Sequence, residues 1–237
     1  MASEVTRRGF LEKAGTVAAV AGVGAALTGA TAEAAEGKAT KIIGLCCSPR
    51  KGKSTATVLK AALDAVKAAN PAIEVELIEL AGLKIPGEVA AGVPLGEGEK
   101  DDFPQLVPKL LDPQVAGIIF GTPVYFGNMS SLCKAFLDRC IVFHKKFELA
   151  NKVAGVVAVG GGRNGGQELT IRSVQVALMS QQMIVVGDAP PTAHWGGTVW
   201  ANAGGPGSDV TADEAGMNTA RNVGKRVAEV AMLLTKK

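Results

Sequence analysis

The sequence has 237 residues, of which 47% are hydrophobic and only 4% aromatic, with 30 glycines and a formal net charge of +3. This length and composition suit one α/β domain with a full core and an extra segment, because glycine-rich turns commonly follow the strands of such domains. So small a charge, without basic runs that interleave with aromatic residues, argues against a nucleic-acid-binding protein.

The N-terminal segment combines three features of an export signal in the usual order. Arg7 and Arg8 lie in "VTRRGFLEK", which is similar to the twin-arginine signal. The alanine- and glycine-rich stretch at 14–30 is too short and too mild for a membrane span. Small residues up to Ala34 then offer a cleavage site. A retained N-terminal helix is the alternative interpretation.

We therefore expect a cleaved twin-arginine signal peptide at 1–34 and a mature domain at 35–237. The mature protein would be periplasmic, with no stable membrane span after signal cleavage. The twin-arginine route exports folded proteins, which suits a chain that loads a cofactor before it leaves the cytoplasm.

Apolar runs and amphipathic segments alternate along the mature chain. The apolar runs predict strands at 41–47, 115–126, 152–160 and 183–188, and an alternating segment predicts a further strand at 72–80. Apolar residues at helical spacing predict helices at 54–70, 103–111, 129–147, 167–182 and 211–234, and long loops connect them at 81–102 and 189–210. This alternation predicts an open, doubly wound parallel sheet with helices on both faces, and such sheets bind ligands at the carboxyl ends of their strands.

The start of the first helix and of the last helix carries hydroxyl residues that can cap it. Ser54 or Thr55 can cap the first, and Thr211, with Glu214 three residues later, can cap the last. The strand at 72–80 alternates apolar and polar residues, so we expect it at an edge of the sheet.

The loop after the first strand, "GLCCSPRKGKST" at 44–55, is one residue away from two phosphate-binding motifs. The triphosphate loop needs a glycine where Cys47 stands, and no later strand ends in the required magnesium-binding aspartate. A phosphatase loop needs an arginine where Lys53 stands, and lysine lacks the guanidinium fork. Both interpretations are therefore disfavoured.

A single phosphate monoester fits the same loop without any missing residue. The hydroxyls of Ser48, Ser54 and Thr55, together with the N–H groups at a helix start, suit such a phosphate. The two later strand ends, "TPVYFGNMS" and "GGGRNGG", combine aromatic side chains with glycines that let the backbone approach a ring closely. A phosphate site beside two ring-facing loops is what flavin mononucleotide (FMN) requires. Turns that serve only chain reversal are the alternative.

Three segments, "CCSPRKGKST", "GTPVYFGNMSSLCKAFLDR" and "GGGRNGGQE", resemble the flavin-contacting segments of the NADPH-dependent FMN reductase family, in the flavodoxin-like superfamily. The resemblance covers about residues 40–235 and is closest to the iron–sulfur flavoprotein branch. It implies a five-stranded sheet of order 2-1-3-4-5, non-covalently bound FMN, and a homodimer or homotetramer that builds the site at a subunit interface.

The resemblance also implies which residues bind the cofactor. The phosphate would be held by Ser48, Arg50, Gly52, Ser54 and Thr55. The isoalloxazine ring would be flanked by Pro123, Val124, Tyr125, Phe126, Gly127 and Asn128 on one side, and closed at its other edge by Gly161, Gly162, Arg163, Asn164 and Gly165.

In such a protein FMN carries the chemistry, so we expect neither a catalytic side chain nor a metal. NADPH, NADH or a protein donor would reduce FMN, and a small acceptor would then reoxidise it in a ping-pong cycle. Because NADPH is a cytoplasmic donor, the alternative is an exported FMN electron-transfer protein, served by a redox-protein donor, with no nicotinamide activity of its own.

Two departures from the iron–sulfur branch stand out. The loop at 81–102 contains no cysteine, so we expect no iron–sulfur cluster there. Cys46 and Cys47 replace smaller residues beside the expected phosphate, where a thiol can be reactive or can simply fill the core, as Cys133 and Cys140 would. The pair His194-Trp195 would either cover a flavin or lie in an ordinary surface loop.

Overall fold

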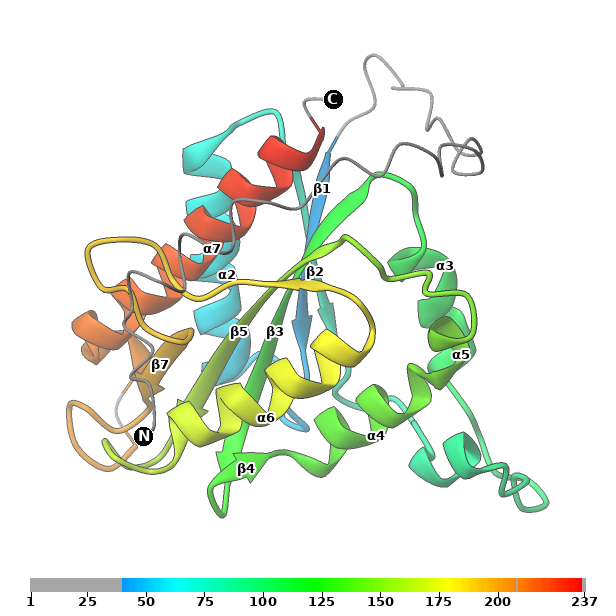
Figure 1. The fold of residues 1–237 in the computed structure, drawn as a ribbon. Coiled ribbons are helices and arrows are strands. Elements are labelled where there is room, and N and C mark those ends of the chain that lie inside the picture. The colour runs from blue at the N-terminus through cyan, green and yellow to red at the C-terminus, as the bar shows by residue number, and fades with distance from the viewer. Residues whose placement is uncertain (1–39, 208, 236–237) are drawn as a thin grey trace, which may run out of the picture. The chain divides into compact units, whose positions relative to one another are not determined.

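The computed structural model describes residues 40–207 and 209–235, which form one sheet between two layers of helices (Figure 1). The signal segment expected at 1–34 lies outside the described residues. The strands are β1 (Lys41–Cys46), β2 (Glu74–Glu79), β3 (Val115–Tyr125), β4 (Asn128–Met129), β5 (Val153–Gly160), β6 (Ile184–Val185) and β7 (Gly197–Trp200). The helices are α2 (Ser54–Ala69), α3 (Val107–Leu110), α4 (Ser131–Arg139), α5 (Ile141–His144), α6 (Gln167–Ser180) and α7 (Glu214–Thr235), with 3₁₀ turns η1 (Gly87–Ala91), η2 (Phe103–Leu106) and η3 (Val210–Ala212).

The sheet has the order β2-β1-β3-β5-β6, and these neighbours are all parallel. The short strand β4 pairs only with β3, as the second arm of a hairpin. When β4 is left out of the numbering, this is the expected order 2-1-3-4-5, and β2 lies at an edge as predicted. The flavodoxin-like fold class is thereby confirmed.

Burial explains which segments became strands. Strands β1 and β5 are buried along almost their whole length on both faces, which is why they read as unbroken apolar runs. Strand β2 is half-buried and alternates glutamates with apolar residues, as an edge strand does.

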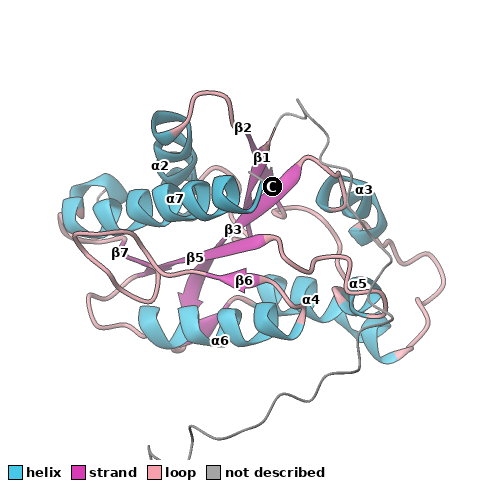
Figure 2. Ribbon diagram, turned by 45° about the horizontal axis from the view of Figure 1, so that its top comes forward, coloured by secondary structure: helices cyan, strands magenta, loops and turns pink. Residues whose placement is uncertain are grey.

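Helices α2 and α7 cover one face of the sheet, and α3, α4, α5 and α6 cover the other (Figures 1 and 2). The first face packs Val58 and Leu59 of α2 beside Val223 and Val227 of α7. The second face contains four fully buried aromatic rings, those of Phe103, Phe120, Phe136 and Phe143. In the described part of the chain, no helix combines the length and apolarity needed to cross a membrane.

The structure corrects four details of the sequence-based prediction. The helix expected at 129–147 is divided at Cys140, where ψ is −3° and the Cys140 N–H is shared between the carbonyls of Phe136 (3.1 Å) and Leu137 (3.2 Å). The loop expected at 189–210 contains β7, which extends the sheet beside β5. Two expected caps are also wrong. Neither Ser54 nor Thr55 caps α2, which starts after Lys53 without a side-chain cap, and Asp213 rather than Thr211 accepts the Gly216 N–H at the start of α7 (3.1 Å).

Candidate functional site

The three segments predicted to bind FMN leave the sheet at the same edge. Cys46 at the end of β1 pairs with Gly121 of β3, and Thr122 pairs with Ala158 near the end of β5. Parallel pairing therefore brings the loop after β1, the hairpin after β3 and the glycine loop after β5 to the carboxyl ends of three neighbouring strands. This is the edge at which open α/β sheets bind their ligands.

The loop after β1 presents an uncapped helix start. Ser48 is buried, and its hydroxyl accepts a hydrogen bond from the Arg50 N–H (3.1 Å). Gly52 turns the exposed loop with a φ of +64°, a conformation that favours glycine. Among the described residues, no side chain caps α2 and the hydroxyls of Ser54 and Thr55 have no hydrogen-bond partner. The first N–H groups of a long helix are thus available to an anion.

Glu79, at the end of the edge strand β2, is a residue of this loop region that the sequence analysis missed. Its Oε2 accepts a hydrogen bond from the Gly52 N–H (2.7 Å), so it fixes the tip of the loop against the sheet. The contact joins residues 27 positions apart, and no local sequence motif predicts it. Because this carboxylate is negative, an anion at the start of α2 would rely on nearby cations such as Arg50 and Lys53 to balance it.

The hairpin after β3 presents aromatic side chains. Pro123 is buried, Val124 is partly buried and Tyr125 is exposed, and Tyr125 pairs with Asn128 across the turn. Phe126 and Gly127 both have positive φ values, of 50° and 73°, as in a type I′ hairpin. Glycine adopts this conformation without strain, whereas phenylalanine does not. Phe126 therefore has a strained backbone and a fully exposed side chain, so packing of the core does not explain a phenylalanine here, and a role in ligand or subunit binding is indicated.

The glycine loop after β5 is exposed from Gly161 to Gly165, and a buried glutamine holds its shape. Gln167 Nε2 donates to the Gly162 carbonyl (2.6 Å), and Gln167 Oε1 accepts from the Gly165 N–H (2.9 Å). The sequence analysis missed Gln167, although it directly follows the glycine run. The guanidinium of Arg163 lies 4.8 Å from the centre of the Trp200 ring.

The glycine loop and the hairpin touch each other. A Cβ built on Gly166 would lie 2.7 Å from the Cα of Gly127, which is closer than real Cβ contacts come. Only glycine therefore permits this approach, and it brings the two segments expected to flank the ring into direct contact.

Ser130 joins the hairpin to the loop after β1. Its hydroxyl donates to the Cys47 carbonyl (2.7 Å) and accepts from the Cys133 N–H (3.1 Å), which caps α4. Its backbone N–H donates to the Thr122 hydroxyl (3.1 Å). The sequence analysis also missed this buried serine. It occupies the N-cap position of α4, which a serine directly before the helical segment in "NMSSL" could have predicted.

The structure thus brings all three predicted segments together at one sheet edge, with the uncapped start of α2 on one side and aromatic side chains on the other. The contact of each individual residue with FMN stays a prediction.

The four cysteines are all buried. Burial raises the pKa of the Cys46 thiol to about 11. A hydrogen bond with Cys133 and burial together raise the pKa of the Cys47 thiol well above its usual value, and burial does the same for Cys140. The burial and raised pKa values of Cys46 and Cys47 favour their interpretation as fillers of the core over a reactive pair. Within the described residues, no group of three or more His, Cys, Asp or Glu side chains is arranged to hold a metal.

Comparison with known proteins gives consistent matches. Residues 40–196 match the family model of NADPH-dependent FMN reductase. An iron–sulfur flavoprotein of Methanocaldococcus jannaschii is 42% identical over 199 residues, covering 83% of this chain and all of the relative. A protein of Aromatoleum aromaticum named NAD(P)H dehydrogenase (quinone) is 33% identical over 172 residues, covering 68% of this chain and 77% of the relative.

Among solved structures, an oxidoreductase from Corynebacterium diphtheriae has a similar fold, with a TM-score of 0.61 and 19% identity over 83% of this chain and 98% of that one.

The buried thiols predict slow alkylation. At pH 8 a thiol with a pKa of about 11 is ionised to about one part in a thousand, whereas an ordinary thiol with a pKa of about 8.5 is ionised to roughly a quarter. Iodoacetamide should therefore label the native protein at least about 100-fold more slowly than the urea-unfolded protein, as followed by mass spectrometry. Fast labelling of Cys46 or Cys47 in the native protein would restore the reactive interpretation.

Proposed function

The chain belongs to the NADPH-dependent FMN reductase family of oxidoreductases, and from this premise we propose that it binds FMN where β1, β3 and β5 end and passes electrons from a donor to a small acceptor. The observation that carries the proposal is the uncapped start of α2, beside two loops that meet at Gly127 and Gly166. When bound, FMN supplies the two-electron chemistry, and the protein positions it and controls access.

The residues at this edge fit FMN. The N–H groups at the start of α2, with the Ser54 and Thr55 hydroxyls, suit the phosphate, because both are hydrogen-bond donors that no described side chain uses. The exposed ring of Tyr125 and the peptide groups of the glycine loop suit a flat, hydrogen-bonding ring system. Gln167 and Ser130 would keep these groups in place, since both are buried and fully engaged with the loops.

The donor separates two versions of the proposal. In the first, NADPH or NADH reduces the flavin and the acceptor follows in a ping-pong cycle. In the second, an exported FMN protein receives electrons only from a redox protein, a version that the twin-arginine sequence at Arg7 and Arg8 favours. A quinone is the first acceptor to test, because the Aromatoleum relative is named NAD(P)H dehydrogenase (quinone).

An iron–sulfur cluster, which the name of the Methanocaldococcus relative implies for that protein, does not fit the cysteines of this chain. The chain has four cysteines, at 46, 47, 133 and 140, and all four are buried. Among the described residues, no three His, Cys, Asp or Glu side chains are arranged to hold a metal, so these cysteines do not form a set of cluster ligands. We therefore propose electron transfer without a cluster.

We also propose that a second copy of the chain covers the outer face of α6. Leu169, Val176 and Met179 lie on this face, and each is more than half exposed. Leu169 approaches Gly127, next to the fully exposed Phe126, so the apolar face continues to the tip of the hairpin. A homodimer or homotetramer formed here would bring the predicted flavin-binding hairpin into the subunit interface.

We propose export to the periplasm by the twin-arginine route, which rests on the sequence around Arg7 and Arg8 and on the mild apolar stretch that follows. Cleavage after Ala34 would leave residues 35–237 as the mature protein.

The purified protein should contain close to one FMN per chain. Anaerobic mixing with NADPH or NADH, followed at the flavin absorbance, should bleach it within the time of an ordinary enzymatic turnover if the first version holds. Bleaching only by dithionite or by a reduced redox protein would select the second version. A colourless protein that also fails to take up added FMN would contradict both.

Ser54→Ala combined with Thr55→Ala should weaken FMN binding by about two to four powers of ten. The two hydroxyls are expected to bond a charged phosphate, at about 1.5–3 kcal/mol each, and 1.4 kcal/mol corresponds to about tenfold. Riboflavin lacks the phosphate, so its binding should hardly change. Thr57→Ala, one position beyond the first helical turn, is the matched control and should keep FMN affinity within about threefold. Equal losses for both flavins, in a fluorescence titration of the apoprotein, would mean that this loop does not hold the phosphate.

Val176→Glu should convert the oligomer to a monomer, because a charge would be buried in the apolar face of α6. Sedimentation velocity measures the change, with Lys60→Glu on the opposite layer of helices as the control. The proposal of a second copy on this face fails if the wild-type protein is monomeric or if Val176→Glu leaves the oligomer intact.

Arg7→Lys together with Arg8→Lys should keep the full-length, flavin-loaded precursor in the cytoplasm, as seen by cell fractionation and mass spectrometry. Bound flavin in the retained precursor would show that the variant folds. Export of mature-size protein by this variant would contradict the twin-arginine interpretation.

A further inference from the structure

A hollow lies beside the glycine loop, on the side of β7 and α7. Its volume is about 420 Å³, within the range of small-molecule sites. Arg163 of the glycine loop forms part of its wall, so the hollow adjoins the predicted flavin site. Its other lining residues include His194, Thr198, Trp200, Asn218 and Thr219. An indole ring beside polar groups suits a small planar molecule that carries oxygen atoms.

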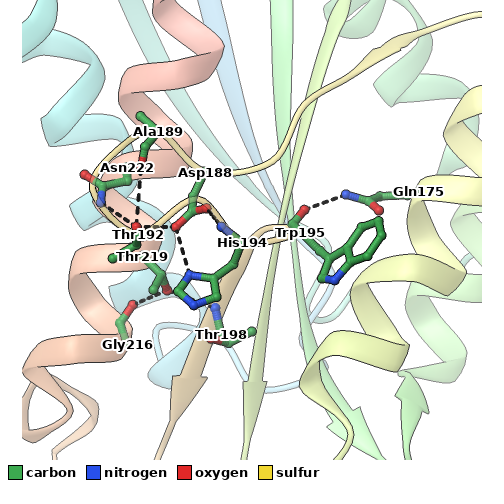
Figure 3. A network of polar contacts seen from close by, with 10 residues as sticks. All are labelled: Gln175, Asp188, Ala189, Thr192, His194, Trp195, Thr198, Gly216, Thr219 and Asn222. Carbon is green, nitrogen blue, oxygen red and sulfur yellow. Dashed lines mark hydrogen bonds and ion pairs between the residues drawn. The ribbon is translucent and has the colours of Figure 1, made fainter.

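One imidazole at this hollow is held by a buried carboxylate (Figure 3). Asp188 Oδ1 accepts the backbone N–H of His194, and Asp188 Oδ2 lies 3.4 Å from His194 Nδ1. The Asp188 side chain is fully buried, whereas the His194 side chain is 44% exposed. Because a carboxylate only accepts hydrogen bonds, we assign the proton of the neutral ring to Nδ1. Nε2 is then the nitrogen that exchanges protons with a ligand or with water.

Hydrogen bonds from Thr192 and, through it, Asn222 hold the Asp188 carboxylate in place. The Thr192 hydroxyl donates to Asp188 Oδ2, and Asn222 Nδ2 of α7 donates to the Thr192 hydroxyl (2.8 Å). On the other side of His194, Gln175 of α6 donates to the Trp195 carbonyl (2.6 Å). The loop that carries the imidazole is therefore anchored to helices on both faces of the sheet.

Loop closure alone would not require this imidazole. The closing bonds use the main chain of residue 194, since its N–H donates to Asp188 and its carbonyl accepts the Asp188 N–H (3.2 Å). Any side chain at 194 would preserve them. The alignment of Nδ1 with Asp188 Oδ2 is an additional feature, and buried carboxylates hold catalytic imidazoles in the same way in other enzymes.

The charges at the hollow favour an acceptor that becomes negative as it is reduced. Arg163 provides a cation, and Asp213 is already engaged with the N–H groups of Trp200 (2.7 Å) and Gly216 (3.1 Å). Negative charge that develops on a ligand oxygen would meet Arg163 and His194 rather than an unpaired carboxylate.

We propose that this hollow binds the electron acceptor, a quinone, and that His194, oriented by Asp188, protonates its oxygen. The inference rests on the proposed function, which supplies the reduced flavin as the source of electrons. Reduced FMN, when bound, would supply the quinone with two electrons and one proton. The second proton leaves Nε2 of the protonated imidazole as the N–H bond breaks and the O–H bond of the hydroquinone forms. The exposed ring then regains its proton from water.

The test compares two acceptors on the FMN-loaded protein. Duroquinone takes up protons on reduction and, being fully substituted, does not add thiols, whereas ferricyanide takes up only electrons. After reduction with dithionite, His194→Gln should slow reoxidation by duroquinone about 100-fold, as expected for loss of a general acid, and leave reoxidation by ferricyanide within about twofold. His144→Gln, at the only other histidine of the chain, is the matched control and should change neither rate.

Two results of this comparison would overturn the proposal. One is a duroquinone rate within about threefold of wild type in His194→Gln. The other is an equal slowing of both acceptors, which would mean that the residue only supports the structure. If the reduced wild-type protein is reoxidised by neither acceptor, the proposed function itself fails, and that outcome is distinct from both.

A second readout needs neither flavin nor turnover. In the His144→Gln background, His194 is the only histidine, so ¹⁵N NMR of the ring reports it alone. The neutral ring should carry its proton on Nδ1, and Asp188→Asn should abolish that preference. Duroquinone should also quench tryptophan fluorescence, and Trp200→Phe should remove most of the quenching. An Nε2–H tautomer in the protein with Asp188 intact, or quenching that survives Trp200→Phe, would contradict the assignment.

Discussion

The hydrogen bond from the Ser130 hydroxyl to the Cys47 carbonyl is the interaction on which the site depends most. It joins residues 83 positions apart, at the points where β1 has just ended and α4 begins. The same serine caps α4 and is buried from solvent. Its replacement by a residue without a hydroxyl would leave the Cys47 carbonyl and the Cys133 N–H without this hydrogen-bond partner. Parallel pairing sets the distance between the two strands, and this serine sets how the loops beyond them are turned toward each other.

A comparable arrangement holds the other half of the site. Gln167 closes the glycine loop through its own two hydrogen bonds, and the contact between Gly166 and Gly127 lets the hairpin lie directly against that loop. In the glycine loop, the residues that would meet a ligand, Gly161 to Gly165, are exposed, and Gln167, which holds them, is buried. This division is expected of a site that must be ready for its ligand before the ligand arrives.

Electrostatics distinguishes the two ends of the site. At the start of α2, the helix N–H groups and the nearby cations face a Glu79 carboxylate, which is used to hold the Gly52 tip. Beside the glycine loop, the Asp188 carboxylate is buried and holds an imidazole toward a hollow. In both places a carboxylate fixes a loop through backbone N–H groups, but only the second also presents a group that can transfer a proton.

Much of this protein follows from its sequence alone. The unbroken apolar runs of β1, β3 and β5 and the helical spacing in α2 and α7 predicted the doubly wound sheet, because a strand buried on both faces and an amphipathic helix differ in their local periodicity. The three loop segments also follow from local composition, and the parallel sheet necessarily gathers them at one edge.

Tertiary structure alone decided the contacts between distant residues. Three hydrogen bonds, Glu79 with Gly52, Ser130 with Cys47 and Asn222 with Thr192, join residues 27, 83 and 30 positions apart. A single side chain that makes such a contact does not change the hydrophobic periodicity of the sequence, so the sequence gives no sign of it. The four-residue strand β7 is a further example. It pairs with residues 157–160 of β5, which the short strand β6 leaves unpaired because β6 pairs only with residues 153 and 154. Local periodicity reports which face of an element is buried, but the choice of partner depends on the packed fold, because hydrogen bonds between loops form only where the sheet has already placed their ends side by side.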